Sequence, residues 1–391
     1  MALALLLSAI AQCCFLYFLT RVGQSLTNRE LEDREANFAV PENKWPRTAL
    51  IVPVAGTRPR MTEALKSLLC QDYPGLTPVF VTATEEEPAA GLIRDLQKEH
   101  PVLRHVVAGQ ARNCGQKNHN SLRGVAAVGD GADVYVFSDS THFADPDFIR
   151  HLVGPLARGT AAITTGYHMV APRDRRCVTL SYALCVLLMR LLQAVPLFTQ
   201  LWGGAMAVSR GAFIQHGVAE LWSRNVVDDC SLTGILSRQG IRIRLCPGAL
   251  LRTDASAHAL PVWRAWMERQ VLFLKFCVPG QWPFLCAFAL LMFLPVVLAA
   301  TALCGGLLNI GSGGAVAAAL AYLAALSAVL NSWRNFFAVA LPLPRLLPAF
   351  ACATGMFAFV CLRGLTAEGI VWHGIAYTVG EGGQVLGMKP L

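Results

Sequence analysis

Charged side chains are scarce in this sequence. Only 15% of its 391 residues are Asp, Glu, Lys or Arg, whereas 54% are hydrophobic, and the mean hydropathy is +0.46. Because soluble domains average about 25% charged residues, the composition excludes an ordinary soluble enzyme and a disordered chain. It is typical of a membrane protein with a water-facing part.

A run of basic residues is also absent, although the formal net charge is +8. We therefore do not expect nucleic acid as a partner. The positive charge suits an anionic membrane surface or a phosphate-bearing substrate equally well.

Cysteines at zinc-site spacing are missing as well. The thirteen cysteines form no C-x-x-C pair, and most lie among apolar residues. This scatter predicts buried free thiols in a reducing compartment. A catalytic cysteine is disfavoured because no neighbouring residue would activate the thiolate.

The chain begins with an apolar stretch from Met1 to about Leu19, close to the roughly 20 residues that a membrane-spanning helix needs. A cleaved signal peptide is the alternative, but a basic n-region is lacking. Basic residues follow the stretch at Arg21, Arg29 and Arg34. By the positive-inside rule they place the next segment in the cytoplasm, so we predict a transmembrane anchor over residues 1–21 with its N-terminus outside.

Residues 45–277 have a different character, because short apolar runs alternate there with helical patterns. The runs lie at 49–54, 78–81, 105–107 and 133–137, and the helical patterns at 61–71, 89–99 and 117–128. This alternation predicts an α/β domain with a mostly parallel, Rossmann-like sheet and helices on both faces. Such sheets bind ligands beyond the carboxyl ends of their strands.

The C-terminal part is apolar again. Trp282–Leu303 is long enough to span a membrane, and Ala315–Leu330 and Leu346–Leu362 are shorter candidates. We predict a transmembrane region of two to three spans over residues 281–364 and a tail over 365–391. A third span puts the tail outside, unless one segment is re-entrant or lies at the interface.

One further apolar stretch, over residues 180–201, is interrupted by Arg190, Gln193 and Pro196. An amphipathic helix on the membrane surface and a buried core helix explain it equally well.

The strongest local signal for chemistry is Asp139, which follows the apolar run ending at Ser138. A carboxylate at the carboxyl end of a strand can hold a divalent cation that neutralises a diphosphate. The alternative is that Asp139 only hydrogen-bonds the turn after its strand.

A second signal is the adjacent pair Asp228 and Asp229, followed by an amphipathic stretch. Two carboxylates in one pocket raise the pKa of one of them, which is what a general base requires. The alternative is a helix N-cap, and both roles can coexist.

Three weaker signals complete the set. The paired glycines Gly203 and Gly204 suggest close approach of the backbone to a ligand, or a plain turn. Lys117 stands near the start of a predicted helix, where it could meet a phosphate, or it is simply solvated. Arg269 lies in an aromatic-basic segment that could cover a nucleotide or form an interfacial belt.

In this order, the segments resemble the inverting GT-A glycosyltransferases of family 2, and in particular the membrane-bound ceramide glucosyltransferase branch with its hopanoid-associated bacterial members. The resemblance covers about 50–275. It is carried by Val52–Gly56, Gln71–Pro74, Lys117 with Asn120, Ser138–Ser140, Gly203–Met206 and Asp228–Asp229.

The resemblance implies a role for each matching residue. Asp139 falls on the aspartate that binds the metal, Mg²⁺ or Mn²⁺, and the diphosphate. Asp229, beside Asp228, falls on the base that deprotonates the acceptor hydroxyl. The implied nucleotide-sugar site comprises Glu87, Lys117, Asn120, Asp139, Gly203, Gly204 and Arg269.

The family then implies a membrane-bound inverting transferase with a cytoplasmic catalytic domain, in a bacterial inner membrane, that moves a sugar from a UDP-sugar to a lipid hydroxyl. Three departures favour an alternative, a catalytically impaired homologue that binds lipid or nucleotide as a membrane subunit. Thr84 replaces an aspartate, Thr141 stands where many bacterial members have a second one, and both residues flanking the (Q/R)-x-x-R-W arginine differ.

Overall fold

A seven-stranded sheet lies at the centre of the α/β part of the chain in this computed structural model, which describes all 391 residues. The strands are β1 (Thr48–Pro53), β2 (Leu76–Thr82), β3 (Arg104–Val107), β4 (Val134–Ser138), β5 (Ile163–Pro172), β6 (Ala205–Ser209) and β7 (Arg244–Ala255). Their order is β3-β2-β1-β4-β6-β5-β7. β1 to β4 pair in parallel, whereas β6 is antiparallel to both of its neighbours. The predicted mostly parallel sheet is therefore confirmed.

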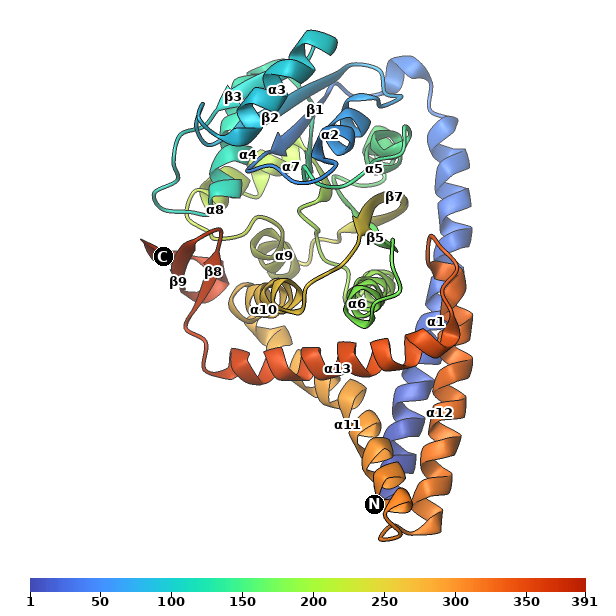
Figure 1. The fold of residues 1–391 in the computed structure, drawn as a ribbon. Coiled ribbons are helices and arrows are strands. Elements are labelled where there is room, and N and C mark those ends of the chain that lie inside the picture. The colour runs from blue at the N-terminus through green and yellow to red at the C-terminus, as the bar shows by residue number, and fades with distance from the viewer.

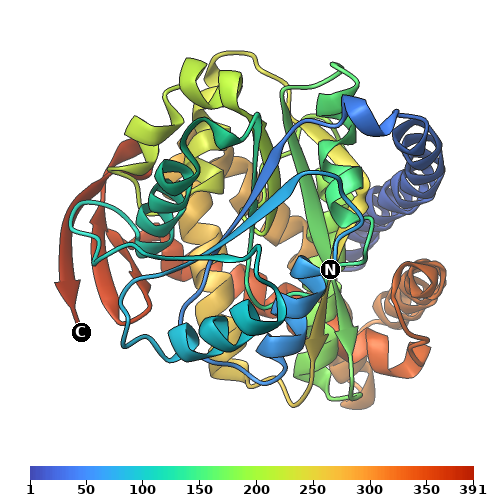
Figure 2. The same cartoon turned by 90° about the horizontal axis from the view of Figure 1, so that it is seen from above.

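Helices cover both faces of this sheet (Figures 1 and 2). They are α2 (Met61–Leu69), α3 (Pro88–Glu99), α4 (Gln116–Val128), α5 (Phe148–Ala157), α7 (Arg210–Gln215), α8 (Val218–Trp222) and α9 (Asp229–Arg238). Successive residues of β1 alternate between two cores: Leu50 and Val52 belong to one, Ala49 and Ile51 to the other. All four are fully buried, which explains why the strand is a continuous apolar run.

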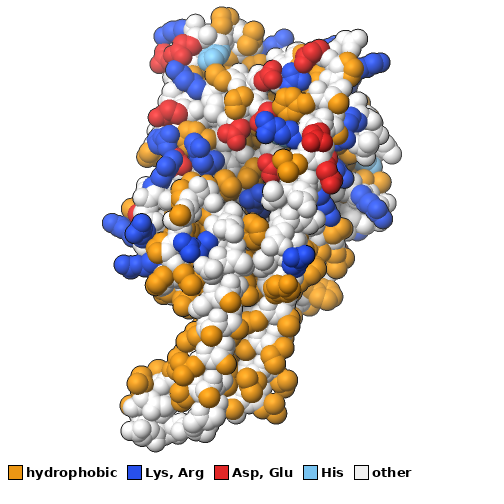
Figure 3. Space-filling view, turned by 90° about the vertical axis from the view of Figure 1, so that its right-hand side faces the viewer, with side chains coloured by type: hydrophobic (Ala, Val, Ile, Leu, Met, Phe, Trp, Pro, Cys, Tyr) orange, Lys and Arg blue, Asp and Glu red, His pale blue; other side chains and the backbone are white.

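Four helices are long and apolar enough to cross a membrane. They are α1 (Ala2–Phe38), α11 (Trp282–Leu307), α12 (Gly313–Trp333) and α13 (Leu343–Leu365). α1, α11 and α12 lie side by side as a stalk below the sheet domain (Figure 1), and the lower part of the face in Figure 3 carries no charged side chain. Short 3-10 turns occur at Glu42–Lys44, Gly129–Gly131, Pro279–Gln281, Arg334–Phe336 and Glu381–Gly383.

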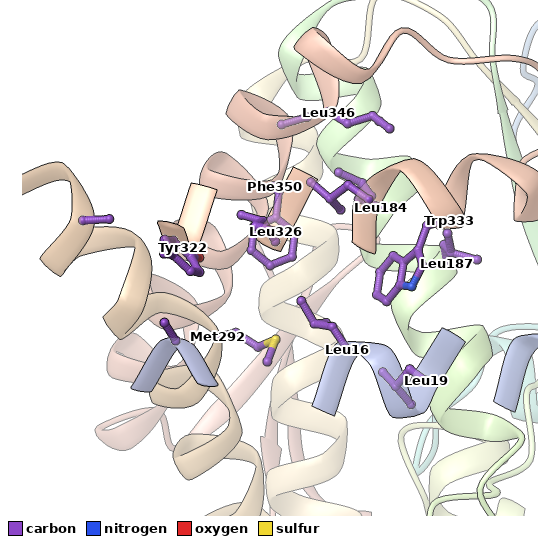
Figure 4. Packing of buried hydrophobic residues seen from close by; sticks show 14 of the residues in the cluster. Leu16, Leu19, Leu184, Leu187, Met292, Tyr322, Leu326, Trp333, Leu346 and Phe350 are labelled. Atoms are coloured by element: carbon purple, nitrogen blue, oxygen red, sulfur yellow. The ribbon is translucent and has the colours of Figure 1, made fainter. Parts of the chain in front are cut away.

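The stalk helices pack through large apolar side chains such as Leu16 and Trp333 (Figure 4). The few buried polar groups bond to one another across helices. Trp333 Nε1 donates to Thr20 Oγ1 at 2.8 Å, and Tyr322 Oη donates to Gln12 Oε1 at 2.7 Å. A stalk in lipid requires this internal satisfaction.

The helix that contains the predicted anchor extends beyond residue 21, because α1 continues to Phe38. The charged half of the helix stays helical because it packs against the sheet domain. Arg244 Nη2 contacts Asp33 Oδ1 and Oδ2 at 2.9 and 3.1 Å, and Asn37 lies against Gly154 of α5.

The stretch predicted over 180–201 forms a shorter helix, α6 (Cys177–Gln193). Pro196 follows its end, where a proline cannot continue the helix. Most of its residues are buried, since Leu180, Leu184 and Leu187 pack into the core of the stalk. Of the two readings left open, the buried helix is therefore correct. α13 packs on α6 and runs across the direction of the stalk (Figure 1).

The predicted tail is not an extended end but a three-stranded antiparallel sheet. It comprises β8 (Gly369–Trp372), β9 (Ile375–Val379) and β10 (Val385–Pro390), and the helix α10 (Leu260–Cys277) packs against it. The backbone N–H of Val226 donates to Gly383 O at 3.0 Å, and that of Val385 donates to Arg224 O at 2.8 Å. The C-terminal sheet thus belongs to the same body as the central sheet.

Candidate active site

The candidate site lies where the parallel part of the sheet meets its antiparallel strand. Asp139 follows the last residue of β4, Ser138, which is paired with Ala205 at the start of β6. Gly203 and Gly204 immediately precede that start, and the Asp139 N–H donates to Gly204 O at 3.4 Å. The antiparallel direction of β6 therefore brings the glycine pair beside the carboxyl end of β4, where open α/β sheets bind ligands.

Lys117 is the centre of the charge cluster. Its Nζ lies 2.8 Å from Asp139 Oδ1 and 3.0 Å from Asp228 Oδ2, and donates to Gly203 O at 3.1 Å. The lysine comes from the first turn of α4. One ammonium thus joins three segments that the sequence separates by up to about a hundred residues.

The paired aspartates have different environments at the start of α9. Asp228 occupies the N-cap position without capping through its side chain; its side chain is 1% exposed, with Lys117 as its only ion-pair partner. Asp229 is half-buried and accepts from the backbone N–H groups of Gly203 at 2.8 Å and Cys230 at 2.6 Å. Asp229 is the member of the pair that a ligand can reach.

The glycine pair is required by close packing. A Cβ on Gly203 would lie 2.6 Å and 2.7 Å from the Asp228 carboxylate oxygens and 2.7 Å from Lys117 Nζ. A Cβ on Gly204 would collide with the indole of Trp202. Gly203 therefore excludes any larger residue unless the charge cluster moves, and Gly204 excludes one unless Trp202 moves.

The two accessible aspartates are shifted in opposite directions. Burial, and then the charge of Asp228, raise the pKa of Asp229 to about 6, although Lys117 opposes this. Burial would also raise the pKa of Asp139, but Lys117 and His142 outweigh it and hold that pKa below its ordinary value. Around neutral pH the site therefore offers a permanently charged carboxylate and a second one poised to take up a proton.

Comparison with known proteins identifies the family of the chain. Residues 4–385 match the family described as "Glycosyl transferase family 21". The chain belongs to glycosyl transferase family 21. The expected resemblance to ceramide glucosyltransferase-type GT-A enzymes is thus confirmed, from the N-terminal helix to the C-terminal sheet.

Two further matches are with glycosyltransferases outside this family description. The processive diacylglycerol beta-glycosyltransferase of Mycoplasma pneumoniae is 30% identical over 99 residues, which is 25% of this chain and 26% of that protein. The mannosyltransferase PcManGT from Pyrobaculum calidifontis, solved in complex with GDP-Man and Mn²⁺, matches with a TM-score of 0.52 at 18% identity, over 93% of this chain and 99% of that one. The second likeness confirms the GT-A fold.

The remaining residues predicted for the donor site make contacts of different kinds. Glu87, at the start of α3, accepts from the Gly56 N–H at 2.5 Å and so ties together the loops after β1 and β2. Arg269 of α10 is half-buried and has no carboxylate partner; burial, and then the nearby charge of Arg58, lower its pKa. An unpaired guanidinium of this kind suits an anionic ligand.

Asn120 does not face the cluster. It is buried, it accepts from Gln116 Nε2 at 2.7 Å, and it donates to Val81 O at 3.4 Å. Its side chain supports the carboxyl end of β2 rather than presenting a group to a ligand.

Sequence reasoning missed a group of residues on the other side of Asp139. The buried His142 and His168 and the half-buried Thr253 and Trp202 form a connected set. In it, Thr253 Oγ1 is 2.7 Å from His142 Nδ1 and 2.9 Å from His168 Nδ1. The one feature of the sequence that could have indicated this group is the position of His142, three residues after Asp139. The C-terminal sheet was missed as well, although Asn225 Nδ2 donates to Gly382 O at 2.6 Å just before the aspartate pair.

Proposed function

We propose that the chain transfers a sugar from a UDP-sugar to a hydroxyl group of a membrane lipid, with inversion at the anomeric carbon. The observation that carries the proposal is the pairing of a half-buried Asp229, with its raised pKa, and the Lys117–Asp139 ion pair in one site of a family 21 chain. The lipid acceptor is supported by the membrane helices joined to this domain and by the name of the Mycoplasma relative.

The reaction is a single displacement. The acceptor oxygen forms a bond to the anomeric carbon while the bond from that carbon to the diphosphate breaks, and the hydroxyl proton passes to the Asp229 carboxylate. The backbone N–H groups of Gly203 and Cys230 hold the carboxylate in place. A pKa of about 6 leaves Asp229 mostly ionised at neutral pH and still basic enough to accept the proton.

The leaving diphosphate carries negative charge that the site has to stabilise. Lys117 supplies an ammonium held in place by two carboxylates, and Arg269 supplies an unpaired guanidinium. Such fixed charges stabilise the transition state because they need no reorganisation during the reaction.

A divalent cation fits the residues present. No three His, Cys, Asp or Glu side chains gather in a group that could hold a metal ion, but Mg²⁺ and its analogues are commonly bound by one or two carboxylates together with substrate phosphates. Asp139 Oδ2 is left free by Lys117, which contacts Oδ1. When bound there, the ion would neutralise charge on the diphosphate.

The helices support a position of the catalytic site close to the membrane surface. α9, which begins at Asp229, packs against α10, and α10 leads through a short turn into the membrane helix α11. The donor would then arrive from the cytoplasm, and the acceptor from the lipid layer below α6, α10 and α13. Arg21, Arg29 and Arg34 on α1 support the cytoplasmic orientation.

The test uses the purified full-length chain in nanodiscs with Mn²⁺ or Mg²⁺. UDP-sugars and GDP-mannose are offered with a membrane lipid extract, and release of nucleoside diphosphate is measured with and without lipid. We expect lipid-dependent release, reduced about 10²–10⁴-fold by Asp229→Asn because general-base catalysis is lost. Asp95→Asn, an exposed carboxylate paired with Lys98, is the matched control.

Release that does not depend on lipid, or that is equal in Asp229→Asn, would contradict the proposal. Donor binding without any turnover would instead establish the alternative role as a binding subunit. The product's anomeric configuration, read by NMR, decides between inversion and retention.

A further inference from the structure

An imidazole lies beside the Asp139 carboxylate and has no role in the reaction described above. His142 Nε2 is 3.7 Å from Asp139 Oδ2, while the other ring nitrogen, Nδ1, is 2.7 Å from Thr253 Oγ1. Lys117 contacts the opposite carboxylate oxygen, Oδ1, at 2.8 Å. The two oxygens of Asp139 therefore face different partners, one an ammonium and the other an imidazole nitrogen with no other side-chain contact.

The orientation of this imidazole is fixed by two strands. Phe143 and Arg252 exchange two backbone hydrogen bonds of 2.8 Å, which hold the loop after Asp139 against β7. Thr253 is thereby placed against the His142 ring, and its Oγ1 also lies 2.9 Å from His168 Nδ1 of β5. His168 in turn stacks on Trp202, with ring centres 4.6 Å apart and planes 10° apart.

This arrangement is what a metal-binding histidine needs. Histidines that ligate metals through one ring nitrogen almost always use the other in a hydrogen bond that sets the tautomer and the ring orientation. Thr253 can accept from Nδ1–H of His142 and donate to Nδ1 of His168, which leaves a lone pair on His142 Nε2. His142 Nε2 lies 3.7 Å from Asp139 Oδ2.

We propose that His142 Nε2 and Asp139 Oδ2 together are the protein ligands of the divalent cation that binds the donor diphosphate. The sequence supports this assignment, because Thr141 stands where a second aspartate would otherwise supply an oxygen ligand. This inference rests on the proposed function, since the diphosphate and water supply the remaining ligands.

The distance between the two atoms is compatible with one shared ion. Oxygen and nitrogen ligands lie about 2.0–2.2 Å from small divalent cations, so two of them can be at most about 4.4 Å apart. The 3.7 Å separation of Asp139 Oδ2 and His142 Nε2 is within this limit. Because imidazole suits transition ions better than Mg²⁺, the site should prefer Mn²⁺.

The direct test is spectroscopic and does not depend on turnover. Mn²⁺ and UDP are added to the purified full-length chain, and pulsed EPR is used to detect nitrogen-14 coupled to the Mn²⁺ ion. We expect an imidazole nitrogen signal in the wild-type protein and its loss in His142→Ala. Mn²⁺ affinity, measured by calorimetry with UDP present, should fall at least about tenfold in that variant.

Two further variants guard against a folding artefact. Thr253→Val keeps the His142 imidazole but removes its orienting partner, and it should weaken Mn²⁺ binding about tenfold while the nitrogen signal persists. His216→Ala removes a histidine that faces Gln239 instead of the site, and it should change neither quantity. UDP binding in EDTA, equal in all four proteins, shows that each is folded.

The outcomes distinguish failure of the His142 assignment from failure of the proposed function. A wild-type Mn²⁺–UDP complex without a nitrogen signal, or with the same signal in His142→Ala, overturns the assignment of His142 and leaves the transferase standing. Failure of the wild-type chain to bind any nucleotide diphosphate with Mn²⁺, or equal affinity for Mn²⁺ in Asp139→Ala, contradicts the proposed donor site itself.

Discussion

The surroundings of Asp139 and Asp229 shift the pKa values of these two carboxylates in opposite directions. Asp139 faces Lys117 and His142, which keep it ionised. Asp229 is half-buried, and burial followed by the charge of Asp228 raises its pKa to about 6. Pairs of titratable groups whose pKa values diverge in this way are typical of sites with a fixed charge and a separate base.

This difference predicts how the rate depends on pH. A base works only when ionised, so lipid-dependent release should rise from pH 5 to pH 7 with a midpoint near 6. The fraction of ionised base changes about tenfold between these two pH values. Initial rates at saturating donor and lipid measure it. A rate that is flat from pH 5 to pH 7 would remove Asp229 from the role of base.

Gly203 gives a second prediction at the residue scale. Gly203→Ala places a methyl group 2.6 Å and 2.7 Å from the Asp228 oxygens and 2.7 Å from Lys117 Nζ. We expect the Lys117–Asp139 contact to open, turnover to fall at least about tenfold, and stability to drop by about 1–3 kcal/mol because of overpacking. Steady-state rates and thermal unfolding measure these effects.

Gly211→Ala is the matched control, since nothing lies within 4 Å of a Cβ at that position of α7. It should retain full activity. If Gly203→Ala also kept wild-type turnover, the packing around Lys117 would not be needed for the reaction.

At the scale of elements, the sequence predicted most of what local patterns can specify. The first four strands and the helices between them appear as continuous apolar runs and 3.6-residue periods, so β1 to β4 and α2 to α4 lie close to their expected ranges. Asp139, Lys117 and Asp229 were found because each stands at an element boundary. The convergence of Asp139, Asp228 and Gly203 on the Lys117 ammonium, by contrast, depends on the antiparallel insertion of β6, which no local pattern encodes.

The same reasoning explains what was missed. His142 and Thr253 are 111 residues apart and meet only because the loop after β4 pairs with β7. The C-terminal sheet has short strands joined by glycine-containing turns at Gly374 and at Gly380–Gly383, and so gives a weak periodic signal. The continuation of α1 beyond the predicted anchor was not foreseen, because the polar half of the helix is stabilised by contacts with the sheet domain and not by lipid.

The polar half of α1 gives a prediction for this element. Asp33 has a 10% exposed side chain and contacts both Arg244 and Arg158, which are 50% and 25% exposed. Asp33→Ala should therefore lower the free energy of unfolding by about 1–3 kcal/mol, less than for a fully buried ion pair. Thermal unfolding in detergent measures it. Glu32→Ala, one residue away and exposed, should be neutral, and an equal loss in both variants would mean that the helix docks without this ion pair.

At the scale of the whole molecule, the C-terminal sheet constrains how many times the chain crosses the membrane. The loop before Asp228 and the segment around Gly383 are hydrogen-bonded to each other, so both lie on the same side. The chain between them must cross the membrane an even number of times. α11 and α12 run along the stalk, whereas α13 runs across it (Figure 1), so we infer two crossings and an α13 that lies along the surface.

This inference predicts the location of two short segments. An epitope tag inserted in the loop between Asn309 and Ser312, which joins α11 and α12, should be cleaved only from the side of the membrane opposite the sheet domain. A tag after Leu391 should be cleaved only from the cytoplasmic side, together with the sheet domain. Protease digestion of right-side-out and inverted vesicles measures both.

If the two tags were accessible from the same side, α13 would have to cross the membrane or α11 and α12 would have to form a hairpin that returns before crossing. A crossing α13 would separate the C-terminal sheet from Arg224 and Val226 and would be incompatible with their hydrogen bonds. A returning hairpin would keep those hydrogen bonds and would contradict the two crossings. With two crossings, α6, α10 and α13 lie together between the stalk and the charge cluster. Under the proposed function, that position would let an acceptor lipid present its hydroxyl to Asp229 without leaving the membrane surface.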